Sequence, residues 1–176
     1  MSAAPAATKK HAAILDLAAY WLTVAAVYLL AGVLFFYSGK TKLFDDDGHA
    51  PAAIKQQFEG TFVSTFPGID VLWVIIGVLE FTIFGLLVAS LFRGEFLPHK
   101  PKSLLLVGLS LAFFTYACLS FGQTSTGNLQ GTASLYSYFG STAIIFILVL
   151  LLPPNSPRNW LTARRNAVSM RNSPDG

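Results

Sequence analysis

The sequence predicts an all-α integral membrane protein, a bundle of four transmembrane helices, and three observations support this. Of its 176 residues, 53% are hydrophobic and 12% are charged, against about 45–50% and about 25% in soluble proteins. The hydrophobic residues gather in four spans, each of roughly the 20 residues that a helix needs to cross a hydrocarbon core about 30 Å thick. In lipid these spans must be helices, because a helix pairs its backbone groups internally and four isolated spans cannot close a barrel.

The four spans are predicted at about 17–37, 71–92, 104–121 and 135–152. The first is too long for the apolar region of a signal peptide and lacks a convincing cleavage site, so we expect it to remain in the mature protein. Pro153 and Pro154 end the fourth, since proline lacks a backbone donor and clashes with the preceding turn. Residues 17–152 are therefore one membrane domain, between an N-terminal tail at 1–16 and a basic C-terminal tail at 153–176.

The distribution of positive charge predicts the orientation. Nine of the twelve Lys and Arg residues fall on one side of a four-span arrangement, which the positive-inside rule assigns to the cytoplasm. These nine are Lys9, Lys10, Arg93, Lys100, Lys102, Arg158, Arg164, Arg165 and Arg171. Both termini are then cytoplasmic, and we expect the membrane to be the bacterial inner (plasma) membrane. Orientation explains the net charge of +3 without nucleic acid, so the expected partners are membrane lipid and other protein subunits.

The long connection between the first and second spans is predicted to carry a short amphipathic helix on the outer side. Pro51 can open a helix, and Ile54, Phe58 and Phe62 recur every four residues on one face. Such a helix would lie on the membrane surface or cap the bundle. An irregular loop is the alternative.

Small residues predict where the helices approach one another, because in lipid close backbone packing replaces hydrophobic burial as the drive for association. They stand four apart as Gly108 and Ala112 in the third span, and as Ser137 and Ser141 in the fourth. In the second span, Gly77 and Gly85 flank Glu80, where either can seat a neighbouring helix.

Glu80 is the most informative single residue, because it stands about ten positions into the second span and so about 15 Å deep. An acidic side chain at the centre of a helix costs about 2.5–3.5 kcal/mol to insert, and such residues face the bundle interior and find partners. One interpretation is a proton-accepting group in a pocket between helices. The other is a structural anchor that ties helices together.

Lys42 is the candidate partner of Glu80. Apolar residues follow it directly, which indicates that the first helix continues and holds this lysine against protein, whereas Lys40 is expected to reach the head groups. Because Lys42 begins near the interface, direct contact with Glu80 requires a longer first helix or a water-filled outer cavity. The sequence leaves that contact open.

Three further polar residues, Tyr37, Tyr116 and Gln123, lie in the outer halves of their helices and could line the same cavity. For any one of them, an ordinary interface residue is the favoured interpretation. No metal site is predicted, because the three aspartates at 45–47 lack calcium-loop spacing and resemble a solvated turn. No histidine pair lies within the spans to ligate haem, and the single cysteine, Cys118, allows no dithiol or disulfide within the chain.

Two runs of residues resemble the DoxX/DoxD-like family of four-helix membrane proteins. Residues 32–44 read GVLFFYSGKTKLF, with Gly, an apolar run, Ser-Gly, two residues, then Lys and an apolar pair. Residues 77–87 read GVLEFTIFGLL, similar to the family's second-helix pattern of Gly, two apolar residues and Glu, then Gly and more apolar residues. The resemblance spans about 17–152 and implies that Lys42 and Glu80 are the family-type polar residues. It also implies redox work, since family members accompany thiosulfate:quinone oxidation or assemble with superoxide-detoxifying and sulfur-transfer enzymes.

Three functions follow as hypotheses. The first is a membrane subunit of a redox-linked complex whose pocket around Glu80 and Lys42 binds a quinone or another amphiphile. In that scheme Glu80 exchanges a proton and Lys42 stabilises an anionic oxygen. The chain has no covalently bound cofactor and no redox centre of its own, so we do not expect it to be an independent enzyme. The second hypothesis is a non-catalytic membrane anchor or accessory subunit, and the third is a small transporter or lipid-handling protein.

Overall fold

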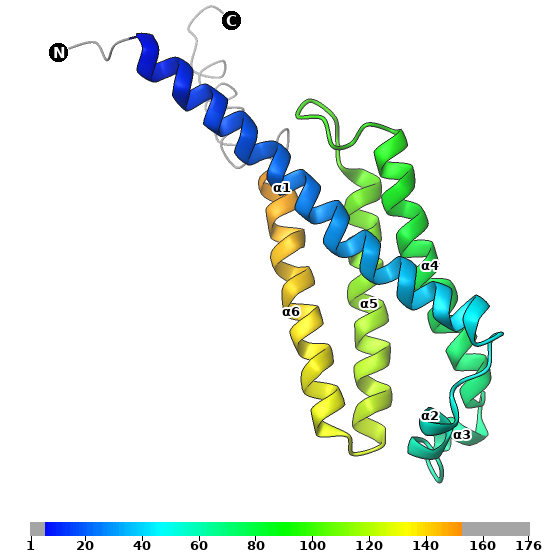
Figure 1. Ribbon diagram of the computed structural model, residues 1–176. Helices are drawn as coiled ribbons and strands as arrows, with labels where there is room; N and C mark the ends of the chain where they lie inside the picture. The colour runs from blue at the N-terminus through cyan, green and yellow to red at the C-terminus, as the bar shows by residue number, and fades with distance from the viewer. Residues whose placement is uncertain (1–5, 153–176) are drawn as a thin grey trace, which may run out of the picture.

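The computed structural model describes residues 6–152, with side chains from residue 15 onward, and these residues form helices and no strand (Figure 1). The elements are α1 (Ala6–Lys40), the π-helix η1 (Thr41–Asp45), α2 (Ala52–Gln57), α3 (Phe62–Thr65), α4 (Ile69–Phe92), α5 (Ser103–Ser125) and α6 (Leu129–Leu151). Four stretches are long and apolar enough to cross a membrane, namely Leu15–Asp45, which joins α1 to η1, and the whole of α4, α5 and α6. The predicted all-α four-helix membrane bundle is confirmed, and α1 with η1 extends the first span at both ends. The predicted tail at 153–176 lies outside the described residues.

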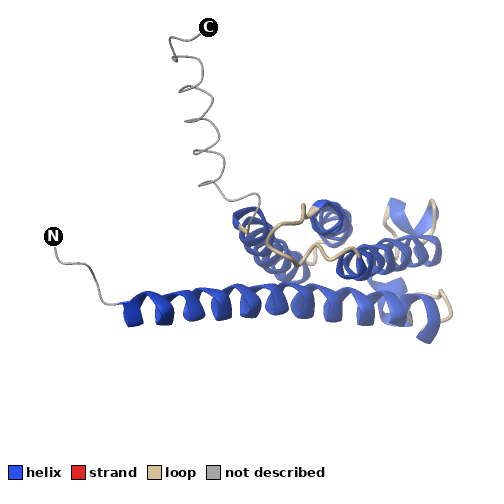
Figure 2. Ribbon diagram, turned by 90° about the horizontal axis from the view of Figure 1, so that it is seen from above, coloured by secondary structure: helices blue, strands red, loops and turns tan. Residues whose placement is uncertain are grey.

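The four long helices pack as a layer of three crossed by the fourth. The helices α4, α5 and α6 stand side by side in chain order, and α1 crosses them diagonally (Figure 1). Seen from above, α1 runs along one side of that group (Figure 2). Apolar side chains from all four helices meet there in one buried cluster of Val27, Ala31, Phe35, Ile83, Leu87, Leu105, Leu109, Ala112, Tyr116 and Val149.

Large apolar side chains also cover the outside of the bundle. Leu22 on α1, Phe92 at the end of α4 and Leu129 at the start of α6 are all largely exposed. A soluble monomer rarely exposes a contiguous apolar surface of this kind, whereas lipid tails are as apolar as leucine. The chain is therefore a multi-pass membrane protein.

Neighbouring helices come close to each other at some of the predicted small residues of α4 and α5, but not at those of α6. A Cβ added at Gly77 would lie 2.9 Å from the Cβ of Lys42, and one added at Gly108 would lie 3.4 Å from that of Leu86. Gly85 is exposed with open space around it, so it seats no helix among the described residues. The prediction for Ser137 and Ser141 is also wrong. Both side chains are exposed, and their hydroxyl groups donate hydrogen bonds to backbone carbonyls of their own helix.

The connection between η1 and α4, residues 46–68, folds into a cap over one end of the bundle (Figure 1). The predicted amphipathic helix is confirmed as α2, with Pro51 at its N-terminus, but the helix does not continue to Phe62. The chain turns after Phe58, because Gly60 takes a positive φ of 76°, a conformation that glycine adopts without steric cost. A second short helix, α3, then begins at Phe62.

Candidate functional site

A buried ion pair joins η1, the continuation of α1, to α4 near the cap. The Nζ of Lys42 lies 2.8 Å from Oε2 of Glu80, and the two residues are only 9% and 4% exposed. Glu80 belongs to the face of α4 that is buried in the bundle, which also carries Gly77, Ile83, Leu87 and Ser90. The contact that the sequence left open is therefore made directly.

Lys42 reaches Glu80 because the first helix is longer than the predicted span, which ended at residue 37. After Lys40 the chain continues as a terminal π-helix, in which the Asp46 N–H donates to the Thr41 carbonyl at 2.9 Å. Gly77 on α4 leaves the space that the stem of Lys42 fills.

The Lys42 ammonium has three kinds of partner in this apolar setting. Besides Glu80, it donates to the hydroxyl of Ser38 at 2.7 Å, and it lies 5.0 Å from the centre of the Trp73 ring. Aromatic faces attract cations, and a paired charge is far less costly to bury than an isolated one. The site thus holds a lysine–glutamate pair that is largely enclosed by the bundle.

A cavity of about 210 Å³ opens beside the ion pair, and all four long helices contribute to its wall. Its lining is Leu34, Phe35, Ser38, Lys42, Glu80, Tyr116, Leu119, Leu135 and Tyr138. Tyr116 is buried, its Oη has no hydrogen-bond partner among the described residues, and its ring stacks on Tyr138. This polar cavity is therefore lined by an ammonium, a carboxylate and a tyrosine ring on otherwise apolar walls, and the Oη of Tyr116 itself is covered by protein.

Two of the five predicted site residues lie elsewhere. Tyr37 is 62% exposed, because the α1 residues that line the polar cavity are 34, 35, 38 and 42, and position 37 falls outside that face of the helix. The Oε1 of Gln123 instead accepts a hydrogen bond from Nε2 of Gln57 in the cap at 2.6 Å. Tyr37 and Gln123 were predicted from their depth in the membrane, but neither side chain lines the polar cavity. The structure brings together Lys42, Glu80 and Tyr116.

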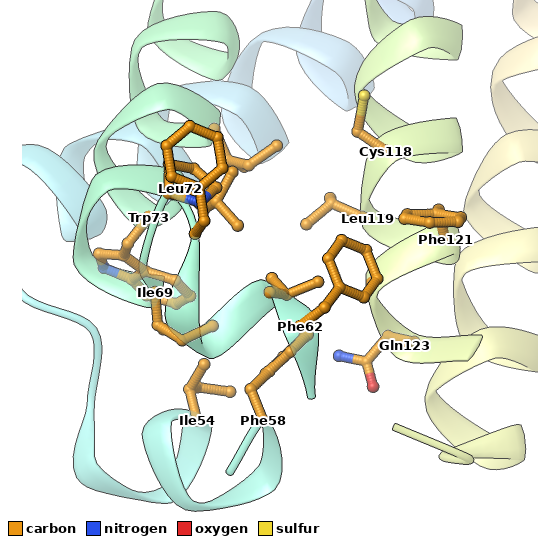
Figure 3. Close-up of a pocket in the computed structure, with 15 residues that line it drawn as sticks. Ile54, Phe58, Phe62, Ile69, Leu72, Trp73, Cys118, Leu119, Phe121 and Gln123 are labelled. Carbon is orange, nitrogen blue, oxygen red and sulfur yellow. The ribbon is translucent and has the colours of Figure 1, made fainter. Parts of the chain in front are cut away.

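A second cavity, of about 320 Å³, lies between the cap and the adjoining ends of α4 and α5 (Figure 3). Its lining is almost wholly apolar: Ile54, Phe58, Phe62, Val63, Phe66, Pro67, Ile69, Leu72, Trp73, Ile76, Cys118, Leu119, Phe121, Gly122 and Gln123. The three cap residues predicted to share one face, Ile54, Phe58 and Phe62, all line it despite the break between α2 and α3. The sequence predicted that apolar face but not the cavity it helps to enclose.

The opposite end of the bundle holds a polar cluster that the sequence did not reveal. Glu95 is 3% exposed and accepts from the N–H groups of Leu104 at 3.1 Å and Leu105 at 3.0 Å, so it caps the first turn of α5. Lys102 is 1% exposed, and its Nζ donates to the carbonyls of Leu97 at 3.2 Å and Lys100 at 3.3 Å. Burial lowers the pKa of Lys102 below the ordinary lysine value, and the nearby charge of Glu95 partly opposes this.

Neither member of that cluster was a predicted site residue, since a glutamate and a lysine beside an apolar span look like ordinary flanking charges. Within the described residues, no three His, Cys, Asp or Glu side chains gather to hold a metal ion. Asp45, one of the three consecutive aspartates, forms an ion pair with Lys40. Comparison with protein-family models, curated proteins and solved structures finds no match to this chain.

Proposed function

We propose that this chain is a membrane subunit of a redox-linked complex and that its polar cavity binds the head group of a quinone. The observation that carries the proposal is the buried ion pair of Lys42 and Glu80, which lines a cavity to which all four long helices contribute. The Oη of Tyr116 makes no hydrogen bond within the described residues, and an unsatisfied buried polar group costs about 1–3 kcal/mol. A ligand oxygen that turned this hydroxyl toward the cavity would remove that cost.

The size and lining of the polar cavity favour a single ring. Its volume of about 210 Å³ is below the ~300–1,000 Å³ of pockets for drug-sized ligands. The flanking rings of Phe35, Tyr116 and Tyr138 can pack on the faces of a flat head group. Lys42 and Tyr116 offer two donors for its oxygens, and Glu80 offers an acceptor.

Lys42 and Glu80 would act on a bound quinone in different ways because their charges are opposite. The Lys42 ammonium, held by Glu80 and Ser38, can stabilise negative charge on a ligand oxygen. Glu80, bonded to that ammonium, can take up or release a proton as the charge on the ligand changes. A bound quinone would supply the two-electron chemistry, with electrons delivered by a partner protein.

The resemblance to the DoxX/DoxD-like family supports the same proposal. The two runs that carry it contain Lys42 and Glu80, and the atoms of these side chains meet at 2.8 Å. We further propose that both termini are cytoplasmic in a bacterial inner membrane and that the cap lies on the outer side, as the charge distribution favours.

A non-catalytic anchor or accessory subunit is the second candidate, and one observation favours it. Lys42 already has a carboxylate, a hydroxyl and an aromatic ring as partners, so the ion pair could serve only to tie α1 to α4. In that case the cavity would stay empty of ligand and the partner proteins would bind elsewhere.

Gentle purification from the native membrane, followed by mass spectrometry of retained proteins and lipid-soluble molecules, separates the two candidates. Recovery of a quinone together with an oxidoreductase supports the redox subunit. Tyr116→Phe should then weaken quinone binding about tenfold, the factor that matches roughly 1.4 kcal/mol for one lost hydrogen bond. Tyr37→Phe is the matched control, since that hydroxyl lies on an exposed side chain. Partner recovery without any quinone would favour the anchor.

A further inference from the structure

The polar cavity is too small to hold more than a head group, so a membrane quinone bound there must place its long tail elsewhere. The larger apolar cavity begins next to it. Leu119 lines both cavities, and Trp73 lines the apolar cavity while its ring faces the Nζ of Lys42 at 5.0 Å. The two cavities are therefore neighbours with Leu119 as a shared wall.

We infer that the apolar cavity beneath the cap binds the isoprenoid tail of a quinone whose head group lies against Lys42, Glu80 and Tyr116. The inference rests on the proposed function and adds the ligand class and a second subsite to it. The tail would pass Leu119 and run between the cap and α5.

The walls of the apolar cavity suit a branched, unsaturated chain. Aromatic rings from the cap, among them Phe58 and Phe62, stand opposite Leu119 and Phe121 of α5 (Figure 3). Methyl branches and double bonds can pack between such rings and gain dispersion contacts.

The cap is fastened over this cavity by polar contacts at its edge. The Nε2 of Gln57 donates to Oε1 of Gln123 at 2.6 Å and to Oγ1 of Thr126 at 3.1 Å. A chain beneath the cap would thus be enclosed by protein on several sides rather than free in lipid.

Binding affinity alone is a weak test of this inference. A tail in the bilayer is already in an apolar solvent, so moving it into an apolar cavity gains packing rather than hydrophobic burial. The position of the tail is the sharper observable, and photochemical labelling reports it.

The experiment uses the full chain in lipid nanodiscs with two diazirine-bearing quinones, one labelled on the ring and one at the end of a short isoprenoid tail. Mass spectrometry maps the modified residues. We expect the ring probe to label residues near Tyr116 and Leu135, and the tail probe to label 54–66 and 118–122. A saturated fatty acid carrying the same diazirine should not label the cap to the same extent.

Cavity-filling variants supply the control. Ile54→Trp, from the cap, and Cys118→Phe, from α5, each place added bulk in the apolar cavity. Either should lower tail labelling of the cap about tenfold, the factor for ~1.4 kcal/mol of lost fit, and leave ring labelling unchanged. Gln56→Trp, an exposed position on the same short helix, should change neither signal.

The outcomes separate this inference from the proposed function. If the ring probe labels the polar cavity but the tail probe labels only lipid-facing residues, or labels the cap equally in the filled variants, the tail subsite is overturned and the proposed function stands. Equal cap labelling by the fatty acid also overturns it. If the ring probe does not label the polar cavity, the proposed function itself fails.

Discussion

Each end of the bundle buries one lysine and one glutamate, but the two pairs of residues are satisfied in different ways. At the cap end, Lys42 and Glu80 bond to each other beside a cavity. At the opposite end, Glu95 bonds to backbone N–H groups at the start of α5, and Lys102 bonds to backbone carbonyls of the preceding turn.

The difference separates residues that shape the fold from residues that can act on a ligand. Glu95 satisfies helix-end donors that have no intrahelical partner, a structural task that leaves no opening for a small molecule. Lys42 and Glu80 instead meet where four helices leave a space, and Tyr116 lines the same space. Burial of a charge alone would not have distinguished the two ends, whereas the identity of the partner atoms does.

The largest effect is expected from breaking the pair at the cap end. Glu80→Leu should lower the free energy of unfolding by about 3–5 kcal/mol, because it leaves the Lys42 charge buried without its carboxylate. Adding Lys42→Met should restore most of that loss, since replacing both partners by apolar groups is often neutral. Denaturant titration of the two single variants and the double variant in one detergent gives the coupling energy. Simple additivity would show that the pair is not coupled.

A somewhat smaller effect is expected at the other end. Glu95→Ala should cost about 2–3 kcal/mol, because two helix-end donors lose a charged acceptor. Unlike the Glu80 variant, it should leave quinone binding unchanged in folded protein. Glu59→Ala, an exposed acid in the cap, is the matched control for charge. Loss of quinone binding in Glu95→Ala would contradict the division between the two ends.

Substitutions at two glycines of α4, Gly77 and Gly85, test how closely Lys42 packs against that helix. A Cβ at Gly77 would lie 2.9 Å from the Cβ of Lys42 and 3.0 Å from Cγ of Leu43, whereas Gly85 has open space. Gly77→Ala should therefore destabilise by about 1–3 kcal/mol through overpacking. Gly85→Ala should be neutral or stabilise by up to about 1 kcal/mol, because alanine is the better helix former. Thermal unfolding of both variants checks the contrast, and equal effects would contradict it.

The smallest effect concerns Lys102. Its pKa is lowered in the folded protein, so between that value and the ordinary lysine pKa the unfolded chain binds more protons. Stability should therefore rise with pH in that alkaline window and become constant above the unfolded value. Lys102→Met should remove this rise and change stability at neutral pH by about 1 kcal/mol, because the carbonyls it leaves belong to the partly exposed Leu97 and the exposed Lys100 and can bond to water instead. An unchanged pH profile in the variant would show that Lys102 is not the group responsible.

The bundle and the inward face of α4 could be predicted because lipid imposes simple rules on length, hydrophobicity and polar burial. Glu80 was recognised by depth alone. Its contact with Lys42 could not be decided, because the sequence did not fix how far the first helix continues beyond residue 37. Tyr37 and Gln123 were candidates by depth, which sequence predicts well, but their rotation about the helix depends on how α1 and α5 lie against their neighbours.

Glu95 and Lys102 show the opposite error. Both flank an apolar span, and charge in that place is explained equally well by orientation in the membrane. Only the fold reveals that Glu95 caps α5 and that Lys102 is enclosed by the turn before it.

The position of Lys42 at the end of the first helix also carries a consequence for evolution. The π-turn lies at and after Lys42, whereas α1 is regular up to Lys40, so deleting one residue of α1 between Phe35 and Lys42 would rotate the lysine by about 100° around the axis. The lysine would still align with Lys42 in any sequence comparison, yet it would face away from Glu80. Among related chains, a one-residue gap here, rather than the presence of the lysine, would then tell which of them retain the ion pair.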